Sequence, residues 1–562
     1  PPTASLMSTA DALRAAARDA LATGRWHDGA RALEALAALA PTDARIWFNM
    51  AMCWRRLGRP AAAEGPLRRT LVCAPDHRAG WLERGAFDGT PATDRAAICA
   101  PEWPAAWNAW ADRHHRTGDD RRASLGFRRA VTLDPGDGGA WFNLTQTLAA
   151  DTGDAPVRFL FRAIASGRAP AAAFEHVAAV VQRQGDASGA IPLYRAVLRQ
   201  QPENADLHAN LAAALIESGA VDAALAALET ALTLDPDLAR ARWMRAWITL
   251  STGDLARGYA DFDCRWRPAD ATSRQHLFGS PLWDGSRLDG PLLIWGETGL
   301  GDEVLFAGLV QEAAARCGQP VILECDARLV ALFAGACPDA TVVARQTPPA
   351  QNIAATRPAA QCSSLRLPLF LRREWGDFPD RRRYLSAAPR RRRAAWRRLR
   401  GIADGPRVGL AWRSANARTG GRKSLPLAAF RPLIESCPEV NFISLQYGDN
   451  GEEIALLREA GLTNLHANPN PDLISDIDDL AAQIACLDGV VTISGVNAHM
   501  AGALGRPGVV LMQKDPLWYW FRSGDASPWY PCLHLLREGP SDGFAAALAA
   551  APAALRAALA GG

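Results

Sequence analysis

The fold of the first half of the chain is decided by the stretch PENADLHANLAAALIESGAVDAALAALETALTLDP at residues 202–236. Its leucines form two stripes, Leu207, Leu211 and Leu215 first and then Leu225, Leu228 and Leu232. Apolar residues three or four positions apart predict two amphipathic helices. Gly219 supplies a turn between them, and Pro202 and Pro236 bracket the unit because proline has no N–H to donate inside a helix. The stretch therefore predicts a helix–turn–helix unit of about 34 residues.

The same unit recurs along 7–265. Its prolines stand at Pro41, Pro75, Pro101, Pro135, Pro170, Pro202 and Pro236. Glycines lie about halfway between prolines at Gly58, Gly118, Gly153 and Gly219, with Gly253 beyond the last, and tryptophans follow six positions after a proline at Trp47, Trp81, Trp107 and Trp141. Apart from the shorter step between Pro75 and Pro101, the prolines recur with a period of about 34, which is typical of tetratricopeptide repeats (TPR), whose helix pairs stack into a superhelix. We expect an all-α TPR domain at 7–265, with a truncated repeat between Pro75 and Pro101.

A repeated asparagine suggests how this domain binds. Asn49, Asn143 and Asn210 each stand eight positions after their proline, at one repeated helix position that can line the concave face. An asparagine amide both donates and accepts hydrogen bonds, so it can hold the backbone of an extended peptide. The alternative is that asparagine serves local structure at this position. The predicted role of the domain is to hold a protein partner.

Composition narrows the class of protein. The net charge of +3 gives no global field for nucleic acid or membrane. No long charge-free apolar stretch predicts a membrane span, and the start at Pro1 lacks the pattern of a signal peptide. The eleven cysteines have no Cys-x-x-Cys spacing, which indicates reduced thiols and no structural zinc. We expect a cytoplasmic protein of several domains.

From residue 291 the pattern changes to short apolar runs, each followed by a loop with glycine or asparagine and then a helical segment. The runs are 291–295, 320–325, 407–412, 441–446, 489–494 and 508–512. Strands that alternate with helices predict parallel sheets covered on both faces. They group into two Rossmann-like halves, 266–400 and 401–562. Ligands of such sheets bind at the carboxyl ends of the strands.

A basic linker lies between the halves. Residues 372–400 hold twelve arginines and three acidic residues. One interpretation is a solvated connector that leads into a helix. The other is a rim that attracts anions near a cleft between the halves.

Four motifs in order carry a family resemblance that covers about 260–540. They are LIWGETGLGD at 293–302, GLAW at 409–412 with RKSLPL at 422–427, the segment 494–507, and SPWYP at 527–531. The set resembles the catalytic half of TPR-linked glycosyltransferases related to the heptosyltransferases. The resemblance implies an α/β module of the GT-B fold, with a nucleotide-sugar in the cleft between two Rossmann-like halves. The layout resembles bacterial flagellin-modifying TPR glycosyltransferases, which use an activated nonulosonic acid such as pseudaminic acid.

The first motif supplies the candidate catalytic residues. Gly299 and Gly301 let the backbone approach a ligand where a strand meets a helix. Asp302 follows at the helix N-terminus, and the resemblance implies that it is the base that deprotonates the acceptor hydroxyl. The alternative is that Asp302 only caps the helix. Glu297, in the same loop, is the second candidate.

The second half supplies candidate donor-binding residues. The resemblance implies that Lys423 contacts the donor phosphates, where a cation stabilises the leaving nucleotide without a metal. Arg413 and Ser414 close the preceding strand, and Gln446 ends the next one, so all three point to the same edge. The alternative for Lys423 is a solvated basic loop.

The segment Ser494-Gly495-Val496-Asn497-Ala498-His499 follows a strand and opens a helix, so its backbone N–H groups can bind an anion. In heptosyltransferases Asp-Thr usually stands where Ser494 and Gly495 stand here, while His499 remains. This departure argues against an ADP-heptose donor. Ser494 and Asn497 suit a donor with its own carboxylate, such as a CMP-linked nonulosonic acid. The alternative for His499 is a packed helix residue.

Two Asp-x-Asp strings, 261–263 and 476–478, resemble metal-binding signatures, but the GT-B resemblance implies that no metal is needed. We therefore expect a metal-independent enzyme with no cofactor beyond its nucleotide-sugar. It moves the sugar to Ser or Thr of a protein acceptor, flagellin by the layout, which the TPR domain holds. Two alternatives remain: a transferase that acts on a lipopolysaccharide or lipid-linked glycan, and a non-catalytic TPR scaffold.

Overall fold

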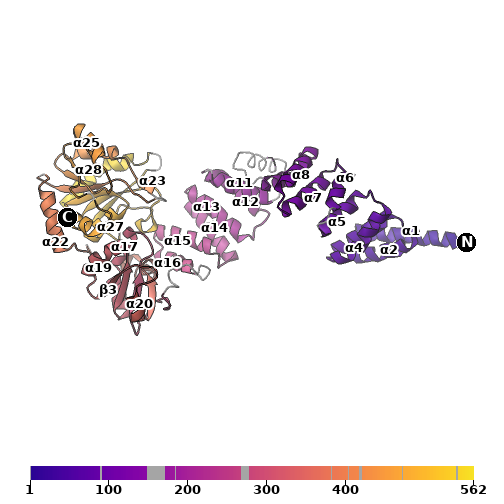
Figure 1. Ribbon diagram of the computed structural model, residues 1–562, viewed down its shortest axis with the longest axis horizontal. Helices are drawn as coiled ribbons and strands as arrows, with labels where there is room; N and C mark the ends of the chain where they lie inside the picture. Colours follow the sequence, from indigo (N-terminus) through magenta and orange to yellow (C-terminus); the bar gives the residue numbers. More distant parts are fainter. Residues whose placement is uncertain are drawn as a thin grey trace. The chain divides into compact units, whose positions relative to one another are not determined.

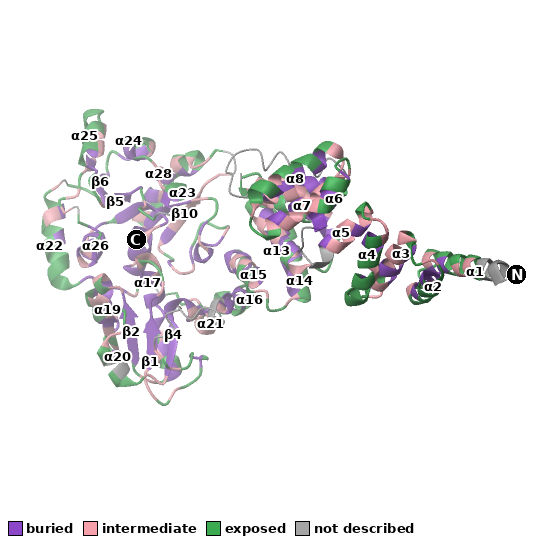
Figure 2. Cartoon of the chain, turned by 45° about the vertical axis from the view of Figure 1, so that its right-hand side comes forward, coloured by how far each residue is buried: buried purple, intermediate pink, exposed green. Residues whose placement is uncertain are grey.

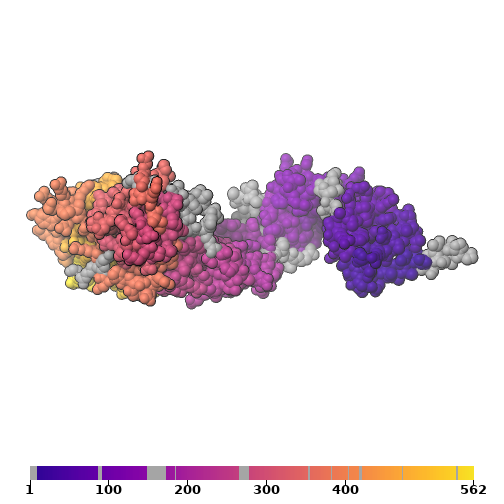
Figure 3. Space-filling model, turned by 90° about the horizontal axis from the view of Figure 1, so that it is seen from below, coloured from indigo at the N-terminus to yellow at the C-terminus, as the bar shows by residue number. Residues whose placement is uncertain are grey.

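The chain forms two compact units, residues 1–234 and 235–562 (Figure 1). This computed structural model describes residues 2–88, 92–147, 162, 171–183, 185–266, 278–380, 383–402, 404–416, 420–470, 472–539 and 542–561. Figure 3 shows the chain as filled atoms, with the other residues in grey. Among the predicted repeat residues, Gly153 and Pro170 lie outside the described part.

Paired helices make up the first unit. They are α1 Pro2–Ala22, α2 Trp26–Leu39, α3 Ala44–Arg56, α4 Pro60–Cys73, α5 Arg78–Asp88, α6 Ala92–Cys99, α7 Pro104–Arg116, α8 Asp120–Leu133, α9 Gly138–Gln146, α11 Ala171–Arg183, α12 Ala187–Leu198, α13 Ala205–Glu217 and α14 Val221–Leu234. The described helices confirm the predicted all-α repeat array. The repeat between Pro75 and Pro101 is short, as predicted, because α6 has only 8 residues.

The repeated residues have clear local roles. The turn glycines have a positive φ, for example +68° at Gly58 and +80° at Gly118, a conformation that residues with a Cβ rarely adopt. The indole N–H of Trp47 donates to the Pro41 carbonyl at 2.8 Å, and Trp141 bonds to its proline in the same way. In the helix pairs that have it, the tryptophan therefore ties the start of the pair to the proline turn.

The second unit holds two parallel sheets. The first has the strand order β3-β2-β1-β4, with β1 Leu292–Trp295, β2 Val321–Cys325, β3 Ala340–Ala344 and β4 Ala360–Ser363. The second has the order β10-β9-β8-β5-β6-β7, with β5 Arg407–Ala411, β6 Asn441–Ser444, β7 Leu465–His466, β8 Gly489–Ile493, β9 Gly508–Met512 and β10 Leu533–Arg537. Every pair of neighbouring strands is parallel. The predicted parallel sheets are therefore confirmed.

Helices cover the faces of both sheets, and most of the strands are buried, while β3 and β10 are buried only in part (Figure 2). The α-helices of this unit are α15 Ala239–Thr252, α16 Leu255–Phe262, α17 Leu300–Ala307, α18 Val310–Cys317, α19 Val330–Ala336, α20 Gln351–Thr356, α21 Pro368–Leu371, α22 Pro389–Arg400, α23 Gly420–Lys423, α24 Arg431–Ser436, α25 Gly451–Glu459, α26 Ile477–Ile484, α27 Val496–Ala503 and α28 Ala545–Ala560. One apolar cluster contains Ile294 of β1, Val304 of α17 and Met500 of α27. The two sheets with their helices therefore share a continuous core.

The division between the units falls at 234/235, before the predicted domain boundary at 265. The reason is a set of aromatic contacts made by the last helix pair. Tyr259 and Phe262 of α16 pack edge-on against Trp518, with ring centroids 5.5 and 5.8 Å apart. Trp518 begins the short 3-10 helix η7, Trp518–Trp520. Helices α15 and α16 thus have a repeat sequence but pack as part of the α/β unit.

Among the described residues, no helix is long and apolar enough to span a membrane.

Candidate functional site

A cavity of about 390 Å³ lies in the second unit, where β5 and β8 end and α17 and α27 begin. Ten of the twelve residues predicted for catalysis or donor binding line it: Gly299, Gly301, Asp302, Arg413, Ser414, Lys423, Ser494, Gly495, Asn497 and His499. These residues lie in loops and helix starts that follow strands of both sheets, so the folding of the unit collects them at one place. The carboxyl ends of parallel strands are the usual ligand site of such sheets.

Asp302 lies in the first turn of α17 and is half-buried. The N-cap of this helix is Gly299, and no side chain caps it. The Asp302 carboxylate accepts a hydrogen bond from the Tyr519 hydroxyl, 2.6 Å from Oδ1. The alternative that Asp302 serves as the helix cap is therefore wrong, and its carboxylate faces the cavity.

Lys423 is buried, and its Nζ donates to the Ser494 carbonyl at 2.7 Å. Burial lowers the pKa of Lys423, because a charged amine loses its hydration, and the negative charge of Asp302 partly opposes this shift. The alternative of a solvated loop is wrong. A buried amine beside a cavity would gain most from an anionic ligand, which would restore a partner to its charge.

The segment that opens α27 lines the cavity with both side chains and backbone. Gly495 is the N-cap, and the first N–H groups of a helix have no partner within it. The Ser494 hydroxyl donates to Gln513 Oε1 at 2.7 Å. Asn497 donates to the Leu445 carbonyl at 3.3 Å, while its own Oδ1 is buried without a hydrogen bond. This end of the cavity can therefore accept an anion or a hydrogen-bond donor.

His499 is fully packed in the first half of α27. Its Nδ1 lies 3.0 Å from the Tyr530 hydroxyl, and burial lowers the pKa of His499 to about 3. The imidazole is therefore neutral near pH 7 and cannot act as a cationic phosphate ligand. The packed alternative from the sequence holds for this residue, which also borders the cavity.

Arg413 and Ser414 follow β5 and form one wall. Arg413 pairs with Glu453, 3.2 Å away. The Ser414 N–H donates to Ser424 Oγ at 2.9 Å, which ties this loop to the segment after α23. The wall therefore carries a cation, but that cation is already paired within the protein.

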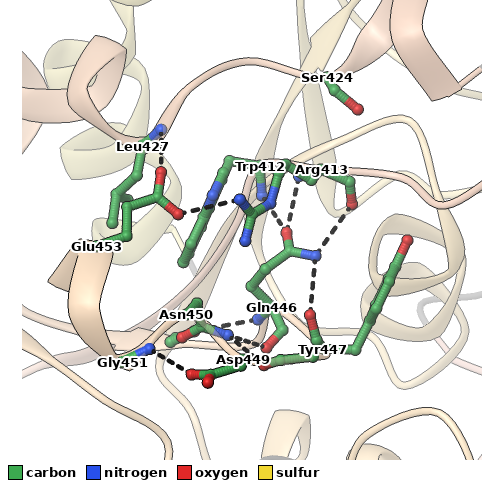
Figure 4. A network of polar contacts seen from close by, with 12 residues as sticks. Trp412, Arg413, Ser424, Leu427, Gln446, Tyr447, Asp449, Asn450, Gly451 and Glu453 are labelled. Atoms are coloured by element: carbon green, nitrogen blue, oxygen red, sulfur yellow. Dashed lines mark hydrogen bonds and ion pairs between the residues drawn. The ribbon is translucent and has the colours of Figure 1, made fainter.

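Gln446 does not line the cavity, contrary to the sequence prediction. Its Oε1 accepts from the backbone N–H groups of Trp412 and Arg413 at 3.0 and 2.7 Å. Its Nε2 donates to the Arg413 carbonyl at 3.3 Å, and at 3.5 Å it reaches the Tyr447 carbonyl. Figure 4 shows this amide between the two loops that follow β5 and β6. Gln446 thus holds the loops after β5 and β6 together by hydrogen bonds to their backbone, and it does not face the cavity.

Glu297 also lies away from the cavity. Its Oε1 accepts a hydrogen bond from the Ser363 hydroxyl, at the end of β4. This carboxylate links the ends of the neighbouring strands β1 and β4, and it lies outside the cavity that Asp302 lines.

Sequence reasoning missed several cavity residues, and two of them, Tyr519 and Arg328, make polar contacts at the cavity. Tyr519, on η7, hydrogen-bonds Asp302, although 217 residues separate them in the chain. Arg328 forms two hydrogen bonds with Asp326, at 2.9 Å each, and its Nη1 donates to the Ile474 carbonyl at 3.1 Å. Neither belongs to a recognisable motif, because each reaches the cavity only through long-range packing.

The arginine-rich segment makes ion pairs and does not supply the described wall of the cavity. Arg372 pairs with Glu312, Arg391 with Asp476 and Arg398 with Asp479. These contacts favour the connector interpretation over the anion-attracting rim. Arg381 and Arg382 lie outside the described residues.

The two Asp-x-Asp strings are occupied by ion pairs and a helix cap. Asp261 pairs with Arg245, at 2.6 Å, and Asp263 pairs with Arg366, also at 2.6 Å. Asp476 caps α26 by accepting from the Asp479 N–H. Within the described ranges, no group of three or more His, Cys, Asp or Glu side chains is placed to hold a metal ion.

In the first unit, a cavity of about 420 Å³ is lined by Asn143 and Asn108. The Oδ1 atom of Asn108, on α7, is buried without a hydrogen-bond partner. The sequence pattern missed Asn108, because it stands seven positions after Pro101 and not eight. Asn49 and Asn210 lie on α3 and α13 and do not line this cavity.

Known proteins match the chain in two ways. Two family models, both described as tetratricopeptide repeat, match residues 14–78 and 182–257. The protein FlbA of Caulobacter vibrioides is 31% identical over 383 residues, a match that covers 62% of this chain and 61% of FlbA. The chain thus spans about three fifths of the length of this curated relative. The matched share is larger than either 7–265 or 266–562 alone, so the match includes residues of both.

Solved structures match with low scores. Yeast Tom70 matches with a TM-score of 0.30 at 15% identity, over 42% of this chain and 54% of Tom70. PilF of Pseudomonas aeruginosa matches with a TM-score of 0.31 at 15% identity, over 35% of this chain and 94% of PilF. Scores this low carry no argument. From its family matches and its sheets, the chain is a tetratricopeptide-repeat protein with a C-terminal region of parallel sheets and helices.

Proposed function

We propose that the second unit is a GT-B glycosyltransferase that moves a sugar from a nucleotide donor to a Ser or Thr hydroxyl of a protein. The observation that carries this proposal is one cavity lined by Asp302, Lys423 and the start of α27. A carboxylate, a buried cation and a helix N-terminus are the groups that such a transfer needs. The sequence resemblance of 260–540 to TPR-linked glycosyltransferases supports the same assignment.

The proposed reaction uses each group once. The acceptor oxygen attacks the anomeric carbon, and its proton passes to the Asp302 carboxylate. The bond between the anomeric carbon and the phosphate oxygen breaks, and the nucleotide leaves as an anion. Lys423 and the N–H groups at the start of α27 stabilise the charge on that oxygen. No metal takes part, because these groups supply the positive charge.

The donor we favour carries a carboxylate, as a CMP-linked nonulosonic acid does, for example one of pseudaminic acid. Ser494 and Gly495 stand where Asp-Thr is usual in the related heptosyltransferases. The buried Oδ1 of Asn497, which has no hydrogen-bond partner, could accept from a sugar or base donor at this end of the cavity.

The repeats would hold the protein acceptor, and flagellin is the acceptor we propose. Tetratricopeptide repeats generally bind proteins through a concave face. Asn108 and Asn143 offer amides in one cavity of the first unit. We place the activity in the cytoplasm, because none of the eleven cysteines, all of which lie among the described residues, is in a disulfide.

The test is transfer to purified flagellin, followed by the intact mass of the acceptor, with CMP-, UDP- and ADP-linked sugars as donors. Asp302→Asn should lower the transfer rate by about 10²- to 10⁴-fold and leave nucleotide binding in place. Glu297→Gln is the matched control, because this carboxyl is in the same loop but outside the cavity. Activity should persist in EDTA. Normal transfer by Asp302→Asn, or a loss in EDTA that manganese restores, would contradict the proposal.

The array of repeats is tested separately, by the affinity of the full chain for flagellin. Replacement of both Asn108 and Asn143 by Ala should weaken this affinity, whereas replacement of Asn49 and Asn210 should matter less. A chain that binds nucleotide-sugars but transfers only to a lipid-linked glycan would instead support the alternative acceptor. A chain that binds no nucleotide would support the scaffold.

A further inference from the structure

The Tyr519 hydroxyl and the Asp302 carboxylate meet at the edge of the cavity. Tyr519 lies on η7, beyond β9, and Asp302 lies on α17, after β1. The hydroxyl donates to Oδ1 at 2.6 Å, a short bond of the kind formed with ionised carboxylates. One oxygen of the candidate base is therefore fixed by a residue from the other sheet's half of the unit.

We propose that Tyr519 is a positioning residue for the Asp302 carboxylate, and that the last repeat helices hold Tyr519 in place through Trp518. This inference rests on the proposed transferase function, in which Asp302 takes the acceptor proton. It adds a structural role for α15 and α16, which are part of the repeat sequence but belong to the second unit.

Tyr519 is suited to donate and not to take the proton itself. Burial raises the pKa of Tyr519 well above its usual value, and the negative charge of Asp302 raises it further. The hydroxyl therefore stays protonated. As a hydrogen-bond donor it holds Oδ1 of Asp302 in one position.

Trp518 anchors η7 from two sides. Its ring stacks on Phe306 of α17, with centroids 6.1 Å apart, and packs edge-on against Tyr259 and Phe262 of α16. Just beyond η7, the Arg522 N–H donates to the Ser251 carbonyl of α15 at 2.8 Å. Helix α17, which carries Asp302, and the last repeat helices α15 and α16 therefore all contact η7 or the residues just after it.

This arrangement makes the catalytic carboxylate dependent on the last repeat helices in a specific way. A shift of α16 would move Trp518, and with it the neighbouring Tyr519. The hydroxyl would then lose its short contact with Oδ1. The path consists of direct contacts only, so each step can be broken by a single substitution.

The experiment compares Tyr519→Phe with Tyr259→Phe in the full chain. Tyr259 is a matched control, because it is a buried tyrosine of the same aromatic cluster whose hydroxyl has no hydrogen-bond partner. Tyr519→Phe should lower kcat about tenfold with an unchanged donor KM. Tyr259→Phe should leave kcat unchanged.

A double-mutant cycle tests the anchor. Trp518→Leu should also lower kcat with an unchanged donor KM, and the two changes together should lower kcat no further than Tyr519→Phe alone. Independent, additive losses in kcat would overturn the role of Trp518. A kcat of Tyr519→Phe equal to that of the unaltered protein would overturn the role of Tyr519.

A measurement without turnover separates this inference from the proposed function. Hydrogen exchange of the amides at 299–303 should speed up in Tyr519→Phe and not in Tyr259→Phe, whether or not the chain transfers sugar. If these amides exchange faster in Tyr519→Phe but the unaltered chain transfers no sugar, the role of Tyr519 in holding Asp302 is supported and the transferase function is rejected. Unchanged exchange would reject the positioning role itself.

Discussion

The imidazole of His499 lies against the backbone of Gly301, so closely that a Cβ added to Gly301 would be 2.8 Å from Cδ2 of the ring. These residues belong to two motifs far apart in the sequence, at the starts of α17 and α27. The contact explains why glycine is needed here. The sequence suggested that Gly301 allows a ligand to approach, but the neighbour that requires it is a packed side chain.

Gly301→Ala should therefore destabilise the second unit. The histidine ring cannot easily move, because it packs against Tyr519, Trp520 and Tyr530. Overpacking of this kind typically costs about 1–3 kcal/mol. Denaturant unfolding of the full chain measures it. Gly299→Ala is the control, because a Cβ there would meet nothing within 4 Å, and it should unfold like the unaltered protein.

His499 should make the stability of this unit depend on pH. Burial lowers the pKa of His499 from 6.5 to about 3, so the folded chain binds fewer protons than the unfolded chain between these values. Stability is therefore fully present above pH 6.5 and is lost as pH falls toward 3. Between pH 7 and pH 5 this residue should account for about 2 kcal/mol.

Hydrogen exchange of the segment 489–503 at the two pH values checks this expectation. His499→Gln should remove most of the dependence, because glutamine does not titrate in this range. His534→Gln is the control: it leaves the buried imidazole of His499 in place, so this variant should keep the pH dependence of stability. An equal pH dependence in the unaltered protein and in His499→Gln would show that the imidazole does not control it.

Lys423→Met should weaken the binding of CMP, UDP or ADP, whichever the chain prefers, by roughly 10- to 100-fold. The substitution keeps an apolar stem but removes the charge that faces the cavity. Burial lowers the pKa of Lys423, so the amine loses its proton at a lower pH than an exposed lysine does. As pH rises, the affinity of the unaltered protein for nucleotide should therefore begin to fall at a lower pH. Calorimetry at several pH values measures both effects.

The neighbouring Arg422 is exposed and provides a matched control for the charge. Arg422→Gln should bind nucleotide nearly as well as the unaltered protein. Equal losses in the two variants would mean that the general positive charge of the loop matters, and not the buried amine.

The sequence predicted well what depends on local pattern. Proline, tryptophan and glycine spacing predicted the helix pairs, and apolar runs predicted β1, β2, β5, β6, β8 and β9. It missed β4, whose residues Ala360–Ser363 include the buried polar Gln361. That side chain is satisfied by Trp295 Nε1, 3.1 Å away, a contact between strands that no local pattern reveals. Edge strand β3 was missed because it is only partly buried.

The site followed the same rule. Motif residues at strand ends reached the cavity, because parallel strands place their carboxyl ends at one edge. Gln446 and Glu297 were misplaced, because the same edge also holds polar side chains that join loops and strands. Tyr519 was missed, since its only link to Asp302 is spatial. Spacing along the chain shows which strand end a residue occupies, but not the direction of its side chain.

Gln446→Ala tests this last distinction. If Gln446 clamps the loops after β5 and β6, its loss leaves the N–H groups of Trp412 and Arg413 without their acceptor and should cost about 1–3 kcal/mol of stability. Denaturant unfolding of the full chain measures it. Gln311→Ala, which removes an exposed amide with a bond to Ala336, is the control and should cost little. A ligand contact would give the opposite pattern, with normal unfolding and a loss of nucleotide affinity as large as that of Lys423→Met.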